Sequence, residues 1–347
     1  MITVEHLTKR YGDFTAVNDL SFEIEDGHVY GFLGPNGAGK STTMNVMTGC
    51  LSATKGHVRI DGYDIFEEPD RAKKRIGYLP EQPPLYMNET PLEYLKFVGE
   101  AKGVKGRELH RQIESVISQT RLEDVKDRLI SNLSKGYRQR VGIAQALLGN
   151  PGVIILDEPT VGLDPIQIIE IRDLIRQLGQ AHTVILSSHI LSEVQTICEK
   201  VLIIDKGKLV AFDEPENLER LLMASNAVSF LAEAETDEIK EVLEEIEAAA
   251  DWQIKKQENG SVRVDVKIES GETADVCRHI FFAFAKREKA LLELTSKKAN
   301  LEDVFLELTE SGVDTVSVDK GEKTDKLDME PTENNDEEWM ERQVDNR

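Results

Sequence analysis

This 347-residue sequence has few cysteines and no long apolar run. Its three cysteines, Cys50, Cys198 and Cys277, have spacings that fit neither a disulfide framework nor a metal site, so we expect a reducing compartment and a cytoplasmic chain. No apolar run approaches the roughly 18 residues that cross a bilayer. The first residues lack the basic start and apolar stretch of a signal peptide, and we therefore expect none.

Positive charge is also scarce, because 42 Lys and Arg residues stand against 64 Asp and Glu residues, a net charge of −22. This balance argues against wide contact with nucleic acid, where Lys and Arg neutralise phosphates. It also argues against direct adsorption to an anionic membrane surface. Any membrane association is therefore expected to pass through a protein partner. The length accommodates a domain of roughly 200 residues and a smaller one.

Residues 34–43, Gly-Pro-Asn-Gly-Ala-Gly-Lys-Ser-Thr-Thr, carry the most specific chemistry in the chain. The pattern G-x-x-x-x-G-K-[ST] predicts a phosphate-binding loop. Its glycines allow successive N–H groups to point at phosphate oxygens, and the helix that begins at its end favours an anion. Lys40 is expected to reach the β- and γ-phosphates, and the Ser41 hydroxyl is expected to bind Mg²⁺. The apolar run 29–33 before the loop fits a buried strand.

Two single residues on either side of this loop have two interpretations each. Tyr11 is either an aromatic ring that stacks on adenine or an ordinary half-buried residue at a strand end. Gln82 follows the predicted strand 76–80, where its carbonyl oxygen can reach a metal or an attacking water. Most glutamines in loops are simply solvated, so the position alone does not decide its role.

Residues 88–148 predict a helical subdomain. Thr90 and Pro91 suit the N-cap and first position of a helix, and apolar stripes follow at helical spacing. Ser134 can cap a further helix, whose apolar residues run from 141 to 148. This second helix start is either a plain capped helix or another anion site.

Two predicted buried strands end in polar residues. The run 153–156 ends at Asp157 and Glu158, whose side chains strand alternation points to opposite sides. One carboxylate can hold Mg²⁺ through water, and the other can orient or deprotonate a water molecule. The run 183–188 ends at His189, on the side where α/β sheets carry their ligands, which favours a functional role.

These elements, in this order, resemble the ATP-binding subunits of ABC transporters over roughly residues 1–220. The resemblance implies an α/β P-loop NTPase domain with an N-terminal antiparallel β subdomain and a helical subdomain. It implies ATP and Mg²⁺ as cofactors and ATP hydrolysis as the reaction. The implied ATP-binding residues are Tyr11, Gly34, Pro35, Asn36, Gly37, Ala38, Gly39, Lys40, Ser41, Thr42, Gln82, Ser134, Gly136 and Asp164. The implied catalytic residues are Glu158, His189 and Lys40, and the implied metal ligands are Ser41, Gln82 and Asp157.

One element departs from the family pattern. The common signature Leu-Ser-Gly-Gly-Gln is replaced by Leu-Ser-Lys-Gly-Tyr at residues 133–137. The groups that would touch phosphate, the Ser134 hydroxyl and the Gly136 backbone, are retained, and Lys135 adds positive charge near the γ-phosphate. A Lys here, followed by Arg-Gln-Arg, is similar to the branch whose membrane partners are of the ABC-2 export type. We therefore expect function to be kept with an altered signature geometry.

The resemblance further implies a composite site. Each ATP would be held by the phosphate-binding loop of one chain and the signature of another, so we expect a second copy or a paralogous ATPase subunit as partner. The groove between Gln82 and the helices after Pro91 would receive a cytoplasmic helix of a separate integral membrane permease. That contact would hold the chain at the inner face of the cell membrane. ATP-driven closure and reopening of the dimer would then power export.

The chain after the ATP-binding domain, predicted as residues 1–223, divides into two parts. Residues 224–310 predict a small ferredoxin-like α+β accessory domain from the order strand-helix-strand-strand-helix-strand. Its first helix is expected over 235–250, and a closing helix over 300–309. Residues 311–347, rich in Asp, Glu, Lys, Asn and Thr, predict a disordered acidic tail.

Two other function classes fit less well. A soluble ABC ATPase that acts on ribosomes or DNA usually carries two nucleotide domains or long coiled-coil insertions, and this sequence has neither. A phosphate-loop kinase or GTPase does not explain the signature stretch, and the Asn-Lys-x-Asp motif that recognises guanine is absent.

Overall fold

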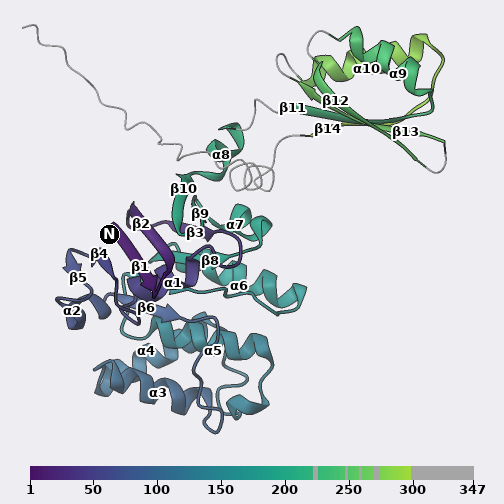
Figure 1. Cartoon of the computed structure of the whole chain (residues 1–347). Coiled ribbons are helices and arrows are strands. Elements are labelled where there is room, and N and C mark those ends of the chain that lie inside the picture. The colour runs from purple at the N-terminus through teal and green to yellow at the C-terminus, as the bar shows by residue number, and fades with distance from the viewer. Residues whose placement is uncertain (222–225, 247–248, 258–259, 269–272, 298–347) are drawn as a thin grey trace, which may run out of the picture. The chain divides into compact units, whose positions relative to one another are not determined.

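The computed structural model describes residues 1–221, 226–246, 249–257, 260–268 and 273–297 (Figure 1). The predicted helix 300–309, the predicted tail 311–347 and the predicted domain boundary at 223 lie outside these residues. No helix in the described part of the chain is both long and apolar enough to span a membrane.

A six-stranded sheet forms the centre of the first part of the chain, in the order β10-β9-β3-β8-β7-β6. The five strands from β9 to β6 pair in parallel, and β10 pairs antiparallel to β9. Every residue of β3 and β7 is buried, as expected for parallel strands covered on both faces. The strands are β3 (Val29–Leu33), β6 (Ile76–Leu79), β7 (Val153–Leu156), β8 (Thr183–Ser188), β9 (Lys200–Asp205) and β10 (Lys208–Asp213).

Side-chain alternation divides the apolar residues of this sheet between two cores. Ile154 and Leu156 of β7 pack on one side with residues of the six helices α3 to α8. Val153 and Ile155 pack on the other side with α1 and the second sheet. The helices are α1 (Lys40–Met47), α2 (Pro69–Lys73), α3 (Pro91–Ala101), α4 (Gly106–Gln119), α5 (Lys135–Leu147), α6 (Pro165–Leu178), α7 (Leu191–Ile197) and α8 (Pro215–Leu221).

The second sheet is antiparallel and has the order β2-β1-β4-β5, which confirms the expected N-terminal β subdomain. Its strands alternate between buried and exposed residues because one face covers the core and the other faces solvent. They are β1 (Ile2–Tyr11), β2 (Phe14–Ile24), β4 (Lys55–Ile60) and β5 (Tyr63–Asp64).

The predicted helical subdomain contains α3, α4, a short 3₁₀ helix at Ile130–Asn132 and α5. Thr90 caps α3 as expected: its Oγ1 accepts a hydrogen bond from the Glu93 N–H at 3.2 Å, and Glu93 Oε2 accepts one from the Thr90 N–H at 2.9 Å. Apolar residues of all three α-helices enter the same core as Ile154 and Leu156. This subdomain therefore shares its hydrophobic core with the central sheet.

The parallel register brings four strand ends to one edge of the central sheet. Leu33 lies opposite Ser188, and Leu156 lies opposite both Leu186 and Leu79. The segments that follow β3, β6, β7 and β8 therefore leave the sheet side by side. In open α/β sheets this edge carries the ligand site.

The described part of the chain after residue 225 forms a separate sheet with two helices. Its strands have the order β12-β13-β11-β14, and all its pairings are antiparallel, as expected for a ferredoxin-like α+β arrangement. Its core contains Phe230 and Phe284, whose rings lie 5.4 Å apart. The elements are β11 (Asn226–Ala232), α9 (Thr236–Glu244), β12 (Ala249–Lys256), β13 (Val262–Ile268), α10 (Thr273–Lys286) and β14 (Leu291–Lys297).

The helix expected over 235–250 is shorter in the structure, because α9 ends at Glu244. Residue Ala249 instead begins β12 and pairs with Ile268 of β13. The alanine-rich segment has a high helix propensity, but pairing with a neighbouring strand outweighs it here.

Candidate functional site

The phosphate-binding loop runs from the end of β3 to the start of α1. Gly39 is the N-cap of α1 with φ 107°, a conformation that residues with a Cβ rarely adopt. A Cβ at this position would also lie 2.6 Å from the backbone oxygen of Ala16. Gly39 is therefore required both by its own backbone angle and by the close approach of β2.

Lys40, the first residue of α1, is held inside this loop. Its side chain is 6% exposed, and its Nζ donates hydrogen bonds to the backbone oxygens of Gly34 at 2.8 Å and Pro35 at 3.3 Å. Burial lowers the pKa of the Lys40 amine, and the nearby Glu158 and Asp157 partly oppose this shift. The amine is thus placed where an anion on the loop would contact it.

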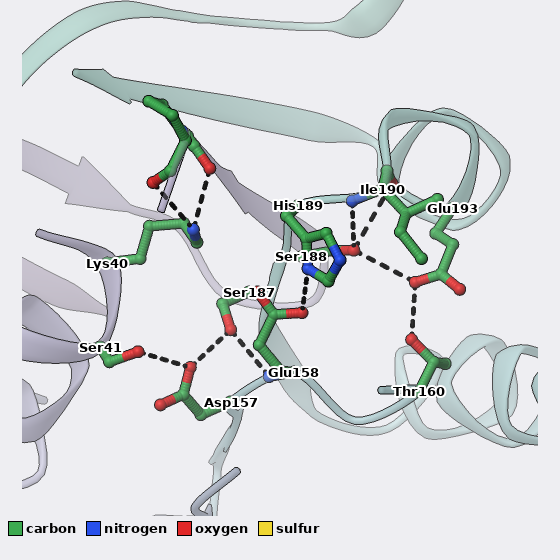
Figure 2. A network of polar contacts seen from close by, with 12 residues as sticks. Lys40, Ser41, Asp157, Glu158, Thr160, Ser187, Ser188, His189, Ile190 and Glu193 are labelled. Carbon is green, nitrogen blue, oxygen red and sulfur yellow. Dashed lines mark hydrogen bonds and ion pairs between the residues drawn. The ribbon is translucent and has the colours of Figure 1, made fainter. Parts of the chain in front are cut away.

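A chain of hydrogen bonds joins the ends of β7, β8 and α1 (Figure 2). Asp157 Oδ1 accepts a hydrogen bond from Ser187 Oγ at 2.6 Å and one from Ser41 Oγ at 3.2 Å. The Glu158 N–H donates to the same Ser187 Oγ at 2.8 Å. His189 Nδ1 lies 2.9 Å from Glu158 Oε2. The loops after three strands are therefore connected through their functional side chains.

Of these residues, Ser41, Glu158 and His189 line a cavity of about 390 Å³. The sequence-predicted residues among those lining it are Tyr11, Asn36, Gly37, Ala38, Gly39, Lys40, Ser41, Thr42, Glu158 and His189. Tyr11 is 49% exposed, and the amine of Lys9 lies 5.3 Å from the centre of its ring. An exposed ring at a cavity wall fits base stacking better than the alternative of a half-buried filler.

Four lining residues were not predicted from the sequence: Phe14, Ala16, Glu81 and Val161. Phe14 begins β2, two residues after Gly12 in the turn that follows Tyr11, so it presents a second aromatic ring. Glu81 lines the cavity, whereas Gln82 is exposed and does not. Residues 81 and 82 form a bend after β6, so strand alternation does not determine which of their side chains faces the cavity.

Ser134, Gly136 and Asp164 do not line the nucleotide cavity. They lie together at a separate hollow of about 400 Å³. Ser134 Oγ accepts a hydrogen bond from the Tyr137 N–H at 3.3 Å and so caps α5. Asp164 Oδ1 accepts one from the Gln167 N–H at 2.9 Å and caps α6. A Cβ at Gly136 would meet the side chain of Gln167 at 2.5 Å, so α5 and α6 approach closely here.

The donor set near Ser41 suits a magnesium ion. The Ser41 hydroxyl and the Asp157 carboxylate offer oxygen ligands 3.2 Å apart, and Mg²⁺ prefers oxygen. Among the described residues there is no group of three or more His, Cys, Asp and Glu side chains that could hold a metal. This fits an ion that takes one or two ligands from protein and the others from phosphates and water.

The substitution Gly39→Ala tests the geometry of the loop. The added Cβ is expected to push the loop away from Ala16, so that binding must restore the original backbone at a cost of about 1–3 kcal/mol. That cost corresponds to roughly ten- to hundredfold weaker ADP binding, measured by calorimetry. Gly152→Ala is the matched control, because a Cβ there meets no atom within 4 Å. Equal ADP affinity in the two variants would contradict this account of the loop.

Comparison with known proteins agrees with this geometry. The family model described as ABC transporter matches residues 17–161. The chain is 35% identical over 312 residues to the uncharacterized ABC transporter ATP-binding protein YhcH of Bacillus subtilis, covering 89% of this chain and 96% of that protein. It is 31% identical over 311 residues to the linearmycin resistance ATP-binding protein LnrL of the same organism, covering 89% and 98%.

A solved structure supports the same relationship. A dimeric bacterial ABC transporter cassette matches with a TM-score of 0.57 and 27% identity, covering 62% of this chain and 98% of that one. The same cassette, in a post-hydrolysis state bound to ADP and phosphate, matches with a TM-score of 0.56 and 26% identity over the same shares. With this fold, this site and relatives along nearly its whole length, the chain belongs to the ATP-binding proteins of ABC transporters.

Proposed function

We propose that this chain hydrolyses ATP together with a second nucleotide domain and so powers export through a separate membrane permease. The observation that carries the hydrolytic part is the contact between Glu158 and His189 at the wall of the cavity that also contains Lys40. Export is supported by the Lys-containing signature and by likeness to a relative named for linearmycin resistance.

In the proposed reaction, the loop N–H groups and Lys40 bind the β- and γ-phosphates. Ser41 and Asp157 would hold Mg²⁺, which supplies charge neutralisation when it is bound. Glu158 accepts a hydrogen bond from the attacking water and takes its proton as the water oxygen bonds to the γ-phosphorus. The bond to the β–γ bridging oxygen breaks, and ADP and phosphate leave. His189 donates a hydrogen bond from Nδ1 to the Glu158 carboxylate and so orients it, and the imidazole helps to position the γ-phosphate.

Glu158 itself occupies an unusual backbone conformation. Its φ is 48°, which residues with a Cβ rarely adopt, and its N–H is fixed by Ser187 Oγ. Strained residues of this kind persist where the surrounding structure over-determines them, often at active sites. This supports Glu158 as the residue that activates the attacking water.

A second nucleotide domain is proposed because the predicted site is divided between two surfaces. Ser134, Gly136 and Asp164 line a hollow that is separate from the cavity of Lys40. Head-to-tail pairing would place the Ser134 hydroxyl and the Gly136 backbone of one chain over the phosphates bound to another. The second domain is another copy of this chain or a paralogous subunit.

The permease is proposed to dock on an exposed aromatic patch at the start of the helical subdomain. Tyr86 is 50% exposed and Phe97 is 52% exposed, and their ring centres lie 5.3 Å apart. The buried Tyr94 packs against Tyr86, with ring centres 5.6 Å apart. The patch adjoins the segment of Gln82, so an apolar helix seated there would be close to the nucleotide site. This contact would hold the chain at the inner face of the membrane.

The part after residue 223 is proposed to be an accessory domain, residues 224–310, followed by a tail. The described helices and strands of this part contain no group of three or more His, Cys, Asp and Glu side chains that could hold a metal ion. We propose that this part stabilises or regulates the dimer.

Glu158→Gln tests the proposed chemistry. Removing the carboxylate base is expected to lower kcat for ATP hydrolysis about a hundredfold or more, because general bases contribute roughly 10²–10⁴-fold. The variant should also accumulate as an ATP-bound dimer, seen by sedimentation. The exposed Glu199→Gln is the control and should hydrolyse ATP at the rate of the unchanged protein. A normal rate in Glu158→Gln would refute the role of this residue.

Phe97→Ala tests the docking patch. Loss of the ring is expected to weaken co-purification with the permease at least several-fold, since buried aromatic anchors dominate interfaces. ATP hydrolysis by the isolated chain should stay unchanged. Phe281→Ala removes an equally exposed ring, 52%, from α10 and should leave capture of the permease intact. Undiminished capture by the Phe97 variant would rule out this patch.

Deletion of residues 224–347 tests the accessory role. We expect a weaker ATP-dependent dimer and reduced transport, while ADP binding to the remaining domain is kept. The measurements are sedimentation, transport in reconstituted vesicles and calorimetry. If ATPase rate, dimerisation and transport all match the full chain, the proposed role is wrong.

A further inference from the structure

A buried carboxylate outside the nucleotide cavity bridges two loops of the site. Glu193, in the first turn of α7, is 1% exposed. Its Oε2 accepts hydrogen bonds from Thr160 Oγ1 at 2.7 Å and from Ser188 Oγ at 3.1 Å. Both hydroxyl residues are themselves buried, so water does not compete for these contacts. Figure 2 shows the carboxylate between the two loops.

The stability of the fold alone does not explain a carboxylate at this position. Arg172 is its ion-pair partner, with Nη2 3.2 Å from Glu193 Oε1. Within the described residues, however, neither Glu193 Oε1 nor Arg172 Nε makes a hydrogen bond. A buried charge with incomplete partners is often no more stable than an apolar side chain of similar size. The two hydroxyl contacts are therefore the specific feature of Glu193.

Both hydroxyl groups sit next to the proposed hydrolytic pair. Thr160 follows Glu158 by two residues, and Ser188 directly precedes His189. Through these two hydrogen bonds, Glu193 connects the loop that carries Glu158 to the segment that carries His189. A second connection between them is the hydrogen bond from the Glu158 N–H to Ser187 Oγ. The 2.9 Å contact between Glu158 and His189 lies between these two connections.

We propose that Glu193 is a positioning residue for ATP hydrolysis. It holds the loop that contains Thr160 against the end of β8. The Glu158 carboxylate and His189 thereby keep the separation at which they can activate the attacking water. A displacement of about 1 Å at a reacting group can cost on the order of a hundredfold in rate. Glu193 does not line the nucleotide cavity, so its effect falls on the chemical step and spares binding. This inference rests on the proposed ATP hydrolysis.

Thr160→Val in the full chain tests the bridge with little change in shape. The variant loses the hydroxyl that contacts Glu193, and we expect kcat to fall about tenfold or more, with KM for ATP and Kd for ADP within about twofold. Thr160→Ser restores a hydroxyl and is expected to recover most of the rate. Glu193→Gln should lower kcat in the same way. Combining it with Thr160→Val should add little, because both changes break one bridge.

Thr183→Val is the matched control, since Thr183 is 2% exposed and its Oγ1 accepts a hydrogen bond from the Gly27 N–H, far along the chain. It should change Tm without changing kcat. A normal kcat in Thr160→Val would overturn the inference, and so would a joint loss of rate and ADP affinity or a failure of Thr160→Ser to recover. Glu158→Gln separates the two proposals: if it abolishes hydrolysis while Thr160→Val does not, only the role of Glu193 is lost.

Discussion

The polar groups of the site depend on the parallel pairing of β3, β8, β7 and β6, because this pairing determines where each strand ends. Residues far apart in the sequence, such as Ser41, Asp157 and Ser187, become hydrogen-bond partners only when the strands end at one edge. Because β3 and β7 are buried on both faces, a slip of one residue would move their side chains into the opposite core, where they would not fit the packing. The core of the sheet and the geometry of the site are therefore set by the same contacts.

Charge adds a second constraint on the same edge. Glu81 and Glu158 line the cavity with Lys40, and Asp157 lies beside Ser41 just next to it. A nucleotide brings further negative charge to these carboxylates. Unpaired charges of one sign in a partly buried site are costly, so the residues favour a nucleotide that arrives with a divalent cation. This charge balance supports the proposal that Ser41 and Asp157 hold Mg²⁺.

Much of the fold and of the site could be predicted because the chemistry is local in sequence. The loop at 34–43, the strand end at Asp157 and the cap at Ser134 each depend on residues within one short segment. Other features of the site depend on tertiary contacts, which a local sequence pattern does not specify. Glu81 lines the cavity and Gln82 does not, because the bend of the chain after β6 determines which side chain faces it.

The same limit applies to pairing and to buried contacts. The helix expected to reach residue 250 ends at Glu244, because strand pairing outweighs helix propensity in the alanine-rich segment. Glu193 and Thr160 meet only when α7 packs beside the loop that follows β7. Nothing in their local sequence distinguishes them from ordinary helix and loop residues.

Lys135, which replaces a glycine of the common signature, depends on a second glycine in another loop for its position. Gly162 adopts φ 69°, and a Cβ on it would lie 2.2 Å from the amine of Lys135. The Lys135 side chain therefore occupies space that a side chain at residue 162 would fill. Any larger residue there would turn the ammonium group outward, toward solvent or a facing molecule. The electrostatic character of the signature surface is thus adjustable from a second loop, 27 residues away, without a change in the signature itself.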